Sequence, residues 1–499
     1  MKKLILLLSA LCIAVSTWAY DFAVDGVYYD ITSSTSPYTV AVTIETDNAN
    51  SYSGTVTIPS TVTYNSISYL VSSIGDYAFA KSTGLTSVTI PSSVTSIGSY
   101  AFYSCTGLSS VTIPSSVTSI GTWAFCSCWG LTSIDLSTSV TSIGDGAFWG
   151  CIDLTTIAIP ASVNKIGSYV FMGCTGLTQI NADAANTNFS SVDGVLYNKD
   201  KSTLLVYPSA RSDVSYTIAS SVDTIGAYAF GYCNNLTSIT IPSTVVYITG
   251  FAFCMCNGLT SVYIPSSVTY FDNNPFYACA GMTAVTVDPA NQYMESVDGV
   301  LFKKGLTTIM YYPPAHSGSS YVIPSTVDYV KSGVFFNCTS LTSVTIPASV
   351  TAIRSSTFSG CTGLTSIYAY PTTPVDLSSA IESPTDVFKG VDTTTCVLHV
   401  PVGSKSLYAA AVQWKAFANI VEDLTSAVST ASASVVKVSV QNGQLQVSGA
   451  TVGETITVYT LQGTALYSQQ ANAATVAVSL PVQGMYVVRV GTESVKVVY

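Results

Sequence analysis

The chain has 499 residues and a formal net charge of −10, and only 9% of its residues are charged against 48% hydrophobic ones. This balance argues against nucleic acid or an anionic membrane as a partner, because both are recognised by basic patches. Beyond an N-terminal apolar run, no stretch qualifies as a membrane span, so the sequence predicts a soluble, mildly acidic protein without a transmembrane segment in its mature form.

Residues 1–19 are predicted to be a secretory signal peptide. Lys2 and Lys3 precede the apolar run, and Thr17 and Ala19 are small residues before a cleavage site. Cys12 leaves a lipoprotein alternative open, although Leu11 stands before it where a small residue is expected. We expect cleavage after Ala19 and a secreted or surface-located product.

Residues 20–70 are predicted to form a β cap. Asp25-Gly26 between apolar residues is a strong hairpin signal, because both turn positions need positive φ. Residues 40–44 alternate as a strand. Such a hairpin would cover the open edge of the structure that follows.

From residue 71 to 422 the dominant feature is a repeat of 23 residues. One phenylalanine per repeat marks it: Phe79, Phe102, Phe125, Phe148, Phe171, Phe230, Phe253, Phe276, Phe335 and Phe358. A fixed period of this length indicates stacked units that bury their apolar faces against one another. The sequence therefore predicts a mostly β solenoid, and function is expected on a long surface.

One unit, from Leu108 to Cys128, explains why the chain coils. Val111 and Ile113 alternate with hydroxyl residues, which predicts a half-buried strand, and Pro114 ends it. A second short run leads from Val117 to Ile120, after which the chain turns back. Each large side chain buried in this way stabilises the stack by about 1.5–3 kcal/mol.

Most of the 13 cysteines fall on a single repeat position. They are Cys105, Cys128, Cys151, Cys174, Cys233, Cys256, Cys279, Cys338 and Cys361. Stacked coils place equivalent residues about 4.7–4.9 Å apart, so distance alone does not exclude disulfides. Parallel side-chain directions favour a reduced internal ladder over a disulfide framework, and a line of thiols does not converge on zinc.

Two intervals in the repeat are longer than the rest. Phe171 to Phe230 and Phe276 to Phe335 each span 59 residues, which is one period plus 36 further residues. Both contain Ser-Val-Asp-Gly-Val-Leu followed by an aromatic residue. We interpret each as a β-hairpin unit inserted near 181–216 and 287–321, on a face that often carries binding.

The last part of the chain changes character. Leu407 to Trp414 has helical spacing and is predicted to cap the solenoid, and residues 423–434 suit a linker. Residues 435–499 are predicted to form a small β sandwich. Its alternating runs are 436–440, 445–447, 456–459, 476–480 and 486–490, separated by Asn442-Gly443, Gly453, Gly463 and Gly484.

The repeated text Leu-Thr-Ser-Val-Thr-Ile-Pro-Ser-Ser-Val resembles the BspA-type leucine-rich repeat family of bacterial surface proteins, over residues from about 70 to 422. Ser or Thr replaces the asparagine of ordinary leucine-rich repeats. The final domain, with Thr457-Val458-Tyr459 and Gly484-Met485-Tyr486, is similar to C-terminal sorting domains of type IX secretion. The resemblance implies an adhesin outside the outer membrane that binds host matrix proteins, glycans or other bacteria.

The sequence offers little catalytic chemistry. His316 and His399 are the only histidines and are best explained as surface or loop residues, and no nucleophile elbow, phosphate loop or metal-ligand spacing accompanies them. Asp25, Asp193 and Asp298 are explained by turn geometry. We predict a non-enzyme without metal or cofactor.

The candidate binding face lies between the inward residues of each strand. It comprises Thr112, Asp135, Ala158, Thr240, Tyr263 and Thr286, with Thr89 and Thr345 on the same position. Plain solubility would produce a similar hydroxyl bias. A second row, two residues before the repeat phenylalanine, is aromatic and would either bind a partner or pack over the turn: Tyr77, Tyr100, Trp123, Tyr169, Tyr228 and Phe251.

Three functional hypotheses remain open. The first is recognition of host or bacterial surface proteins or glycans through the solenoid face. The second is a structural spacer or surface-layer component without a specific ligand. The third, prompted by pairs such as Ser110/Thr112, is an ice-binding array, which Asp135, Ala158 and Tyr263 argue against because they break a flat lattice.

Overall fold

A computed structural model describes residues 20–45, 52–272, 274–378 and 387–424, and in the C-terminal part residues 437–441, 444–448, 454–460, 465–473, 475–480, 485–490 and 493–498. The chain divides into two compact units after Leu424. The predicted signal peptide and residues 425–434 of the predicted linker lie outside the described residues. Residues 423 and 424, by contrast, belong to a strand.

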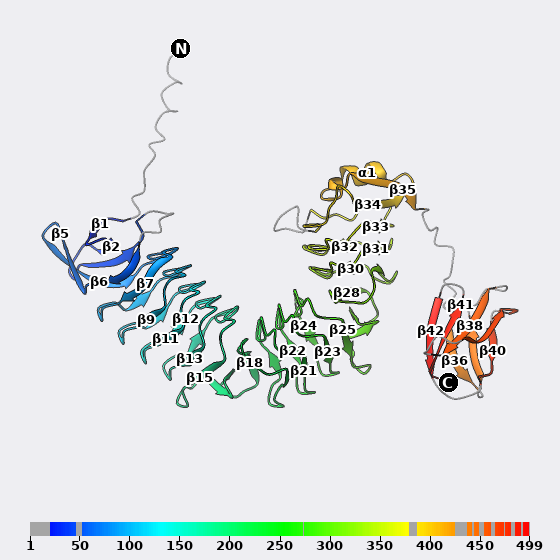
Figure 1. The fold of residues 1–499 in the computed structure, drawn as a ribbon, viewed down its shortest axis with the longest axis horizontal. Helices are drawn as coiled ribbons and strands as arrows, with labels where there is room; N and C mark the ends of the chain where they lie inside the picture. Colours follow the sequence, from blue (N-terminus) through cyan, green and yellow to red (C-terminus); the bar gives the residue numbers. More distant parts are fainter. Residues whose placement is uncertain are drawn as a thin grey trace, which may run out of the picture. The chain divides into compact units, whose positions relative to one another are not determined.

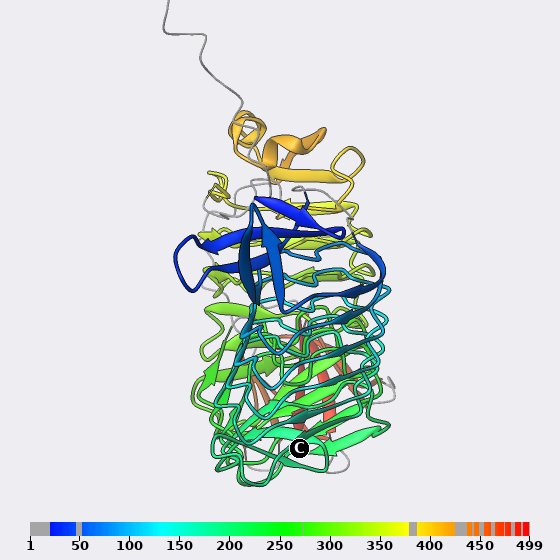
Figure 2. The same ribbon diagram turned by 90° about the vertical axis from the view of Figure 1, so that its left-hand side faces the viewer.

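The N-terminal strands close one end of the first unit (Figures 1 and 2). Strands β1 (Phe22–Val24) and β2 (Val27–Ser33) form the predicted hairpin, with Asp25 at φ 49° and Gly26 at φ 75°. Strand β3 (Thr39–Thr43) pairs with β2 and with β6 (Ile67–Ile74), and β5 (Thr61–Tyr64) pairs with β6. Strand β6 then pairs with the first regular coil, so the cap continues the stack.

One side of every coil is a strand of three to six residues, and these strands form parallel ladders. Equivalent residues pair one repeat apart, as in Val88↔Val111 and Ile134↔Val111. We call these the long strands. They are β4 (Ser53–Thr57), β7 (Gly84–Thr89), β9 (Ser110–Thr112), β11 (Ser133–Asp135), β13 (Thr156–Ile159), β15 (Gln179–Ala182), β19 (Ser215–Thr217), β21 (Ser238–Thr240), β23 (Ser261–Ile264), β25 (Ala284–Val287), β29 (Ser320–Val322), β31 (Ser343–Ile346) and β33 (Ser366–Ala369).

Because β4 already pairs with β7, the ladder starts before residue 70.

A second side of each coil is a two-residue strand, and we call these the short strands. Each pairs in parallel with its neighbours, as in Ile120↔Ile97 and Ile120↔Ile143. They are β8 (Ser96–Ile97), β10 (Ser119–Ile120), β12 (Ser142–Ile143), β14 (Lys165–Ile166), β20 (Thr224–Ile225), β22 (Tyr247–Ile248), β24 (Tyr270–Phe271), β30 (Tyr329–Val330) and β32 (Ala352–Ile353).

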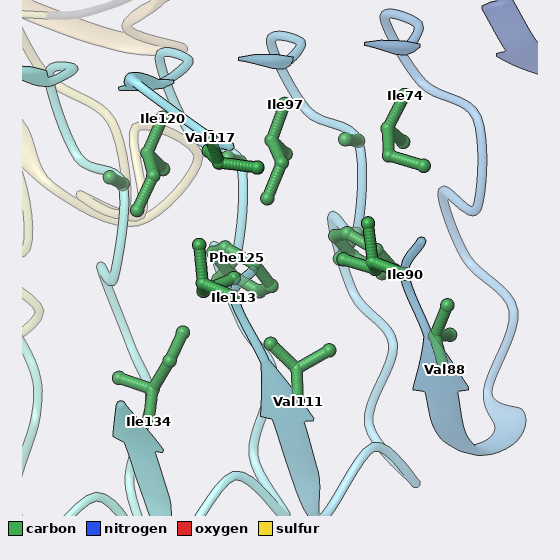
Figure 3. Packing of buried hydrophobic residues seen from close by; sticks show 14 of the residues in the cluster. Ile74, Val88, Ile90, Ile97, Val111, Ile113, Val117, Ile120, Phe125 and Ile134 are labelled. Carbon is green, nitrogen blue, oxygen red and sulfur yellow. The ribbon is translucent and has the colours of Figure 1, made fainter. Parts of the chain in front are cut away.

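The core runs between these two ladders (Figure 3). In the coil from Leu108 to Cys128 every residue predicted to point inward is buried, and the same positions are buried in the neighbouring coils. The repeat phenylalanines stack almost parallel, with ring centroids 5.0 Å apart for Phe79 and Phe102 and 4.9 Å for Phe102 and Phe125. The predicted solenoid with its 23-residue period is thus confirmed.

The cysteine ladder is reduced. All cysteines of the described residues are free and buried. Seven of the nine ladder thiols donate a hydrogen bond to the carbonyl oxygen of the phenylalanine in the preceding coil, for example Cys128 Sγ to Phe102 O at 3.1 Å and Cys151 Sγ to Phe125 O at 3.2 Å. Cys233 and Cys338 instead face the carbonyl oxygens of Tyr207 and Tyr312 at 3.8 and 4.0 Å. Burial raises the pKa of the Cys105 thiol to about 12, which keeps it in the unreactive neutral form.

The two long intervals contain the predicted hairpins. Their strands are β16 (Phe189–Val192), β17 (Val195–Asn198) and β18 (Thr203–Val206), and β26 (Met294–Val297), β27 (Val300–Lys303) and β28 (Thr308–Tyr311). The turn of each hairpin lies against the preceding long strand: Ile180 N–H donates to Gly194 O at 2.9 Å.

Tyrosines continue the stack of phenylalanine rings beyond the hairpins. The ring of Tyr207 lies 5.1 Å from that of Phe230, and the ring of Tyr312 lies 5.0 Å from that of Phe335. The 36 further residues in each interval are therefore one enlarged coil, followed by a standard coil that starts at the tyrosine.

Aromatic residues close the other end of the first unit. Strands β34 (Val397–Pro401) and β35 (Asn419–Leu424) extend the long-strand ladder, and helix α1 (Lys405–Ala410) and the 3₁₀ turn η1 (Trp414–Ala416) lie between them (Figure 1). Trp414 is buried and its Nε1–H donates to Val375 O at 2.9 Å. The predicted helical cap is present, and it is followed by strand β35, which was not predicted.

The second unit contains two antiparallel sheets. One consists of β36 (Lys437–Gln441), β37 (Gln444–Ser448) and β40 (Thr475–Val478), and the other of β39 (Ala465–Gln470), β38 (Thr455–Thr460), β41 (Met485–Val490) and β42 (Glu493–Val498). The five predicted strands are present, and β39 and β42 were not predicted. The glycines predicted to separate the strands lie outside the described residues.

Candidate binding surface

On each long strand, one residue points outward between two apolar residues that point inward; it is exposed in most coils and half-buried at Thr345, Tyr368 and His399. All six predicted binding-face residues are exposed and occupy this position. We call the whole row the strand ribbon. It consists of Thr89, Thr112, Asp135, Ala158, Asn181, Thr217, Thr240, Tyr263, Thr286, Val322, Thr345, Tyr368 and His399.

The hairpins divide the strand ribbon into three stretches. Thr112 pairs with Asp135 in the first stretch, and Tyr263 pairs with Thr286 in the second. Between the stretches, the hairpin turns at Gly194 and Gly299 lie against β15 and β25. The predicted residues therefore form two groups of neighbours on the ribbon, and a ligand that contacts one group would meet a hairpin turn before the other.

Two positions of the ribbon carry aromatic and ionisable groups in contact. The Tyr263 hydroxyl hydrogen-bonds Asp288, which raises the pKa of Tyr263. The pKa of Asp288 is lowered, first by the Ala290 N–H at 2.9 Å and then by Tyr263. These contacts orient the exposed Tyr263 ring on the ribbon.

Near the C-terminal end of the ribbon a second cluster forms. The rings of Tyr368 and His399 stack with centroids 4.4 Å apart and an interplanar angle of 14°. His399 Nδ1 lies 2.7 Å from Asp423 Oδ2. His399 thus lies on a strand with fixed neighbours, whereas the sequence had given it no partner.

In the aromatic row, which stands two residues before each repeat phenylalanine, neighbouring rings stack on one another. Tyr77 and Tyr100 are stacked at 4.9 Å and 1°, and Tyr228 and Phe251 at 5.3 Å and 13°. Their φ values of 57–60° are left-handed, which costs an L-residue roughly 1–2 kcal/mol. Backbone hydrogen bonds to the next coil, such as Tyr100 N–H to Thr122 O at 2.9 Å, hold the turns in place.

Trp123 bridges a gap in this aromatic row. The equivalent residue of the next coil is Gly146, and a Cβ there would come within 2.7 Å of the Trp123 indole. The indole instead continues the stack to Tyr169, with ring centroids 6.4 Å apart. Neighbouring rings of the row therefore pack on one another, as the packing interpretation expects, while Tyr77 and Tyr169 remain 48% and 38% exposed.

The BspA type leucine rich repeat region, in six copies, matches residues 50–192, 210–312 and 310–379, which is more than half of the chain. The chain belongs to the BspA-type leucine-rich repeat family. A comparison with curated proteins gave no match.

Solved structures similar to this BspA-type chain come from several bacteria. A leucine rich cell surface protein from Faecalibacterium prausnitzii is 29% identical, with 70% of this chain and 94% of that chain covered and a TM-score of 0.41. A leucine-rich repeat protein from Bacteroides ovatus is 26% identical, with 70% and 94% covered and a TM-score of 0.42. The pneumococcal vaccine antigen PcpA is 20% identical, with 81% and 98% covered and a TM-score of 0.46.

The other histidine of this BspA-type chain anchors a hairpin turn. His316 Nε2 lies 2.9 Å from Asp298 O, and its Nδ1 accepts from Gly318 N–H at 3.2 Å. At the first hairpin Arg211 takes the same position, hydrogen-bonding Asp193 O and pairing with Asp213 at 2.7 Å. His316 is thus a loop residue with a structural role, in line with its interpretation from the sequence.

Within the part of the chain that the structure describes, no three His, Cys, Asp or Glu side chains gather as a metal site. In the same part, no helix has the length and apolar character needed to cross a bilayer.

Proposed function

We propose that this BspA-type protein is exported and binds macromolecules through its strand ribbon, with a host matrix protein, a glycan or the surface of another bacterium as the partner. One observation carries the proposal: the chemistry of the ribbon varies, while the residues on either side of it are apolar throughout. Val111, Ile134 and Val262 are all buried aliphatic residues, whereas the exposed positions beside them are Thr112, Asp135 and Tyr263.

Solubility alone does not require this variation. A row of threonines would satisfy water and strand propensity at every position, as it does at Thr89 and Thr112. An exposed tyrosine at 263 and an exposed valine at 322 add apolar surface to the ribbon. Exposed aromatic and apolar groups on a long repeat surface are typical of recognition sites.

The test is binding of the mature protein to immobilised matrix proteins, glycans and whole bacteria. We expect the double variant Tyr263→Ala, Asp135→Ala to lose about tenfold or more in affinity for the retained partner, because aromatic anchors carry much of the energy at such interfaces. The matched control is Tyr247→Ala, since Tyr247 is 47% exposed against 49% for Tyr263 but lies on a short strand. Absence of any retained partner would favour the spacer role.

We further propose that residues 1–19 direct export and that residues 435–499 act as a sorting domain. The separation of the second unit after Leu424 supports this, because such a unit can be removed without cutting the solenoid core. Deleting residues 435–499 is expected to leave the solenoid folded and to abolish surface display.

Circular dichroism of the truncated protein and protease accessibility on whole cells measure these two effects separately. Surface display that persists after the deletion would rule out the sorting role, and a truncated protein that unfolds would show that the two units depend on each other.

A further inference from the structure

The short-strand ladder is interrupted at each enlarged coil, once between β14 and β18 and once between β24 and β28. Each interruption leaves a cleft, of about 220 Å³ at the first junction and about 350 Å³ at the second. The two junctions lie 105 residues apart in sequence, as Phe171 and Phe276 do, so their lining residues can be compared one by one. Apolar residues line both clefts at three equivalent positions: Ile166 and Phe271, Phe189 and Met294, and Leu205 and Met310.

The second cleft also carries tyrosines and lysines at positions where the first junction has other residues, while the tyrosines of the first cleft, Tyr169, Tyr207 and Tyr228, lie at different positions. The second-cleft residues are Tyr270, Tyr293, Lys303, Tyr329 and Lys331, where the first junction has Lys165, Asn188, Asn198, Thr224 and Gly226. Since the same coil geometry forms with a lysine at position 165 and with small residues at the other four positions, the fold does not need three tyrosines and two lysines there. Their presence calls for another explanation.

The tyrosine rings are placed to contact a ligand. Tyr270 and Tyr293 are 47% and 52% exposed although they line the cleft. Tyr329 is half-buried and fixed by Arg354, whose Nε donates to the Tyr329 hydroxyl at 2.7 Å and whose guanidinium lies 5.1 Å from the ring centroid. One ring is therefore held rigidly while two remain open to solvent.

The lysines supply positive charge in an acidic molecule. No lysine or arginine occurs between Arg211 and Lys303, so these cations are not part of a general basic surface. Lys304 pairs with Glu295 at 3.9 Å, whereas neither Lys303 nor Lys331 has a carboxylate within ion-pairing distance among the residues that the structure describes.

Burial lowers the pKa of Lys331, and the charge of Asp272 only partly opposes this. A half-buried ammonium group without a close counter-ion gains free energy from a bound anion.

We propose that this second cleft binds an acidic saccharide, that is, a sugar chain with carboxylate or sulfate groups. The C–H faces of sugar rings pack on the tyrosine rings and on the apolar floor of Met294 and Met310, and the anionic group pairs with Lys303 and Lys331. The cleft volume falls in the range of about 300–1,000 Å³ that small-ligand sites usually have. The cleft lies on the short-strand side, so the inference does not rest on the strand ribbon.

The experiment is isothermal titration calorimetry of the full mature protein with four probes. Hyaluronan hexasaccharide carries carboxylates, chondroitin sulfate hexasaccharide adds sulfates, N-acetylchitohexaose is neutral, and a short polyglutamate carries charge without sugar rings. We expect binding of at least one acidic saccharide that weakens with added salt, because the lysine contacts are screened. We expect much weaker binding of the neutral sugar and of polyglutamate.

Variants place the binding in the cleft. The double variant Lys303→Gln, Lys331→Gln and the single variant Tyr293→Ala are each expected to weaken binding by about tenfold. The matched control is Asn188→Ala, the equivalent of Tyr293 at the first junction, and it is expected to leave affinity unchanged. Thermal melting verifies that each variant is folded.

Three results would overturn the proposal: no acidic saccharide bound at millimolar concentration, equal binding of polyglutamate, or affinity that is insensitive to the cleft variants in folded protein. If the Tyr263 variant loses binding at the strand ribbon but still binds the saccharide, the second cleft is a site independent of the ribbon.

Discussion

Replacing Phe148 with alanine is expected to destabilise its part of the solenoid by about 3–5 kcal/mol, the usual cost of removing a buried phenyl ring. Phe148 is fully buried, and its ring stacks between those of Phe125 at 5.6 Å and Phe171 at 5.8 Å. The loss should be local, because each coil of a repeat protein contacts only its neighbours. Hydrogen exchange by mass spectrometry is expected to show faster exchange over residues 125–171, with new protease cuts in the same region.

Trp129→Ala is the control for this variant, because Trp129 is a large aromatic residue that is 52% exposed and is not one of the stacked phenylalanine rings. Its substitution is expected to change stability by no more than about 0.5 kcal/mol. Unchanged exchange and proteolysis around Phe148 in the alanine variant would show that the phenyl stack does not anchor the coils.

The period of the sequence was sufficient to predict most of the fold. Leucine, valine and isoleucine at fixed offsets from each phenylalanine can only be buried together if equivalent residues stack, and the ladders follow from that condition. The Asp25-Gly26 hairpin was predictable for a separate reason, because few residue pairs accept positive φ at both turn positions.

Substitutions within the repeat limited the prediction elsewhere. Tyr207 and Tyr312 continue the phenylalanine stack, but a repeat defined by phenylalanine alone does not include them. The signal was present, because each stands 23 residues before the next repeat phenylalanine and 26 before a ladder cysteine. Likewise Tyr52 packs against Phe79 with ring centroids 4.6 Å apart, so the stack begins inside the predicted cap.

The candidate surfaces were also predicted only in part. Alternation along a strand predicted which residues of the ribbon are exposed. It could not predict whether the rings of the aromatic row face solvent or one another, because spacing fixes the neighbour of a ring and not its side-chain torsions.

The second cleft was not predicted, since residues 269–271, 293–310 and 329–331 meet only through the enlarged coil. Comparing the two 105-residue units position by position would have identified its unusual residues.

Replacing Asn186 with alanine is expected to destabilise the first enlarged coil on the order of 3 kcal/mol, because it leaves several buried backbone groups without partners. The buried side chain of Asn186 donates to Pro160 O at 2.7 Å and to Val163 O at 2.9 Å. Its Oδ1 accepts from the N–H groups of Asn188 and Phe189, both at 2.8 Å. One side chain thus joins the loop that leads into the hairpin to the coil before it.

Asn291 makes the same four contacts in the second enlarged coil, including the Met294 N–H at 2.9 Å. Asn291→Ala is therefore expected to show a similar loss in denaturant unfolding and, because Met294 lines the second cleft, to weaken saccharide binding there as well. Asn188→Ala, which removes an exposed amide two residues from Asn186, is the control and should unfold like the parent protein. If Asn186→Ala unfolds at the same denaturant concentration as this control, the enlarged coil is held by its hairpin strands and not by the buried amide.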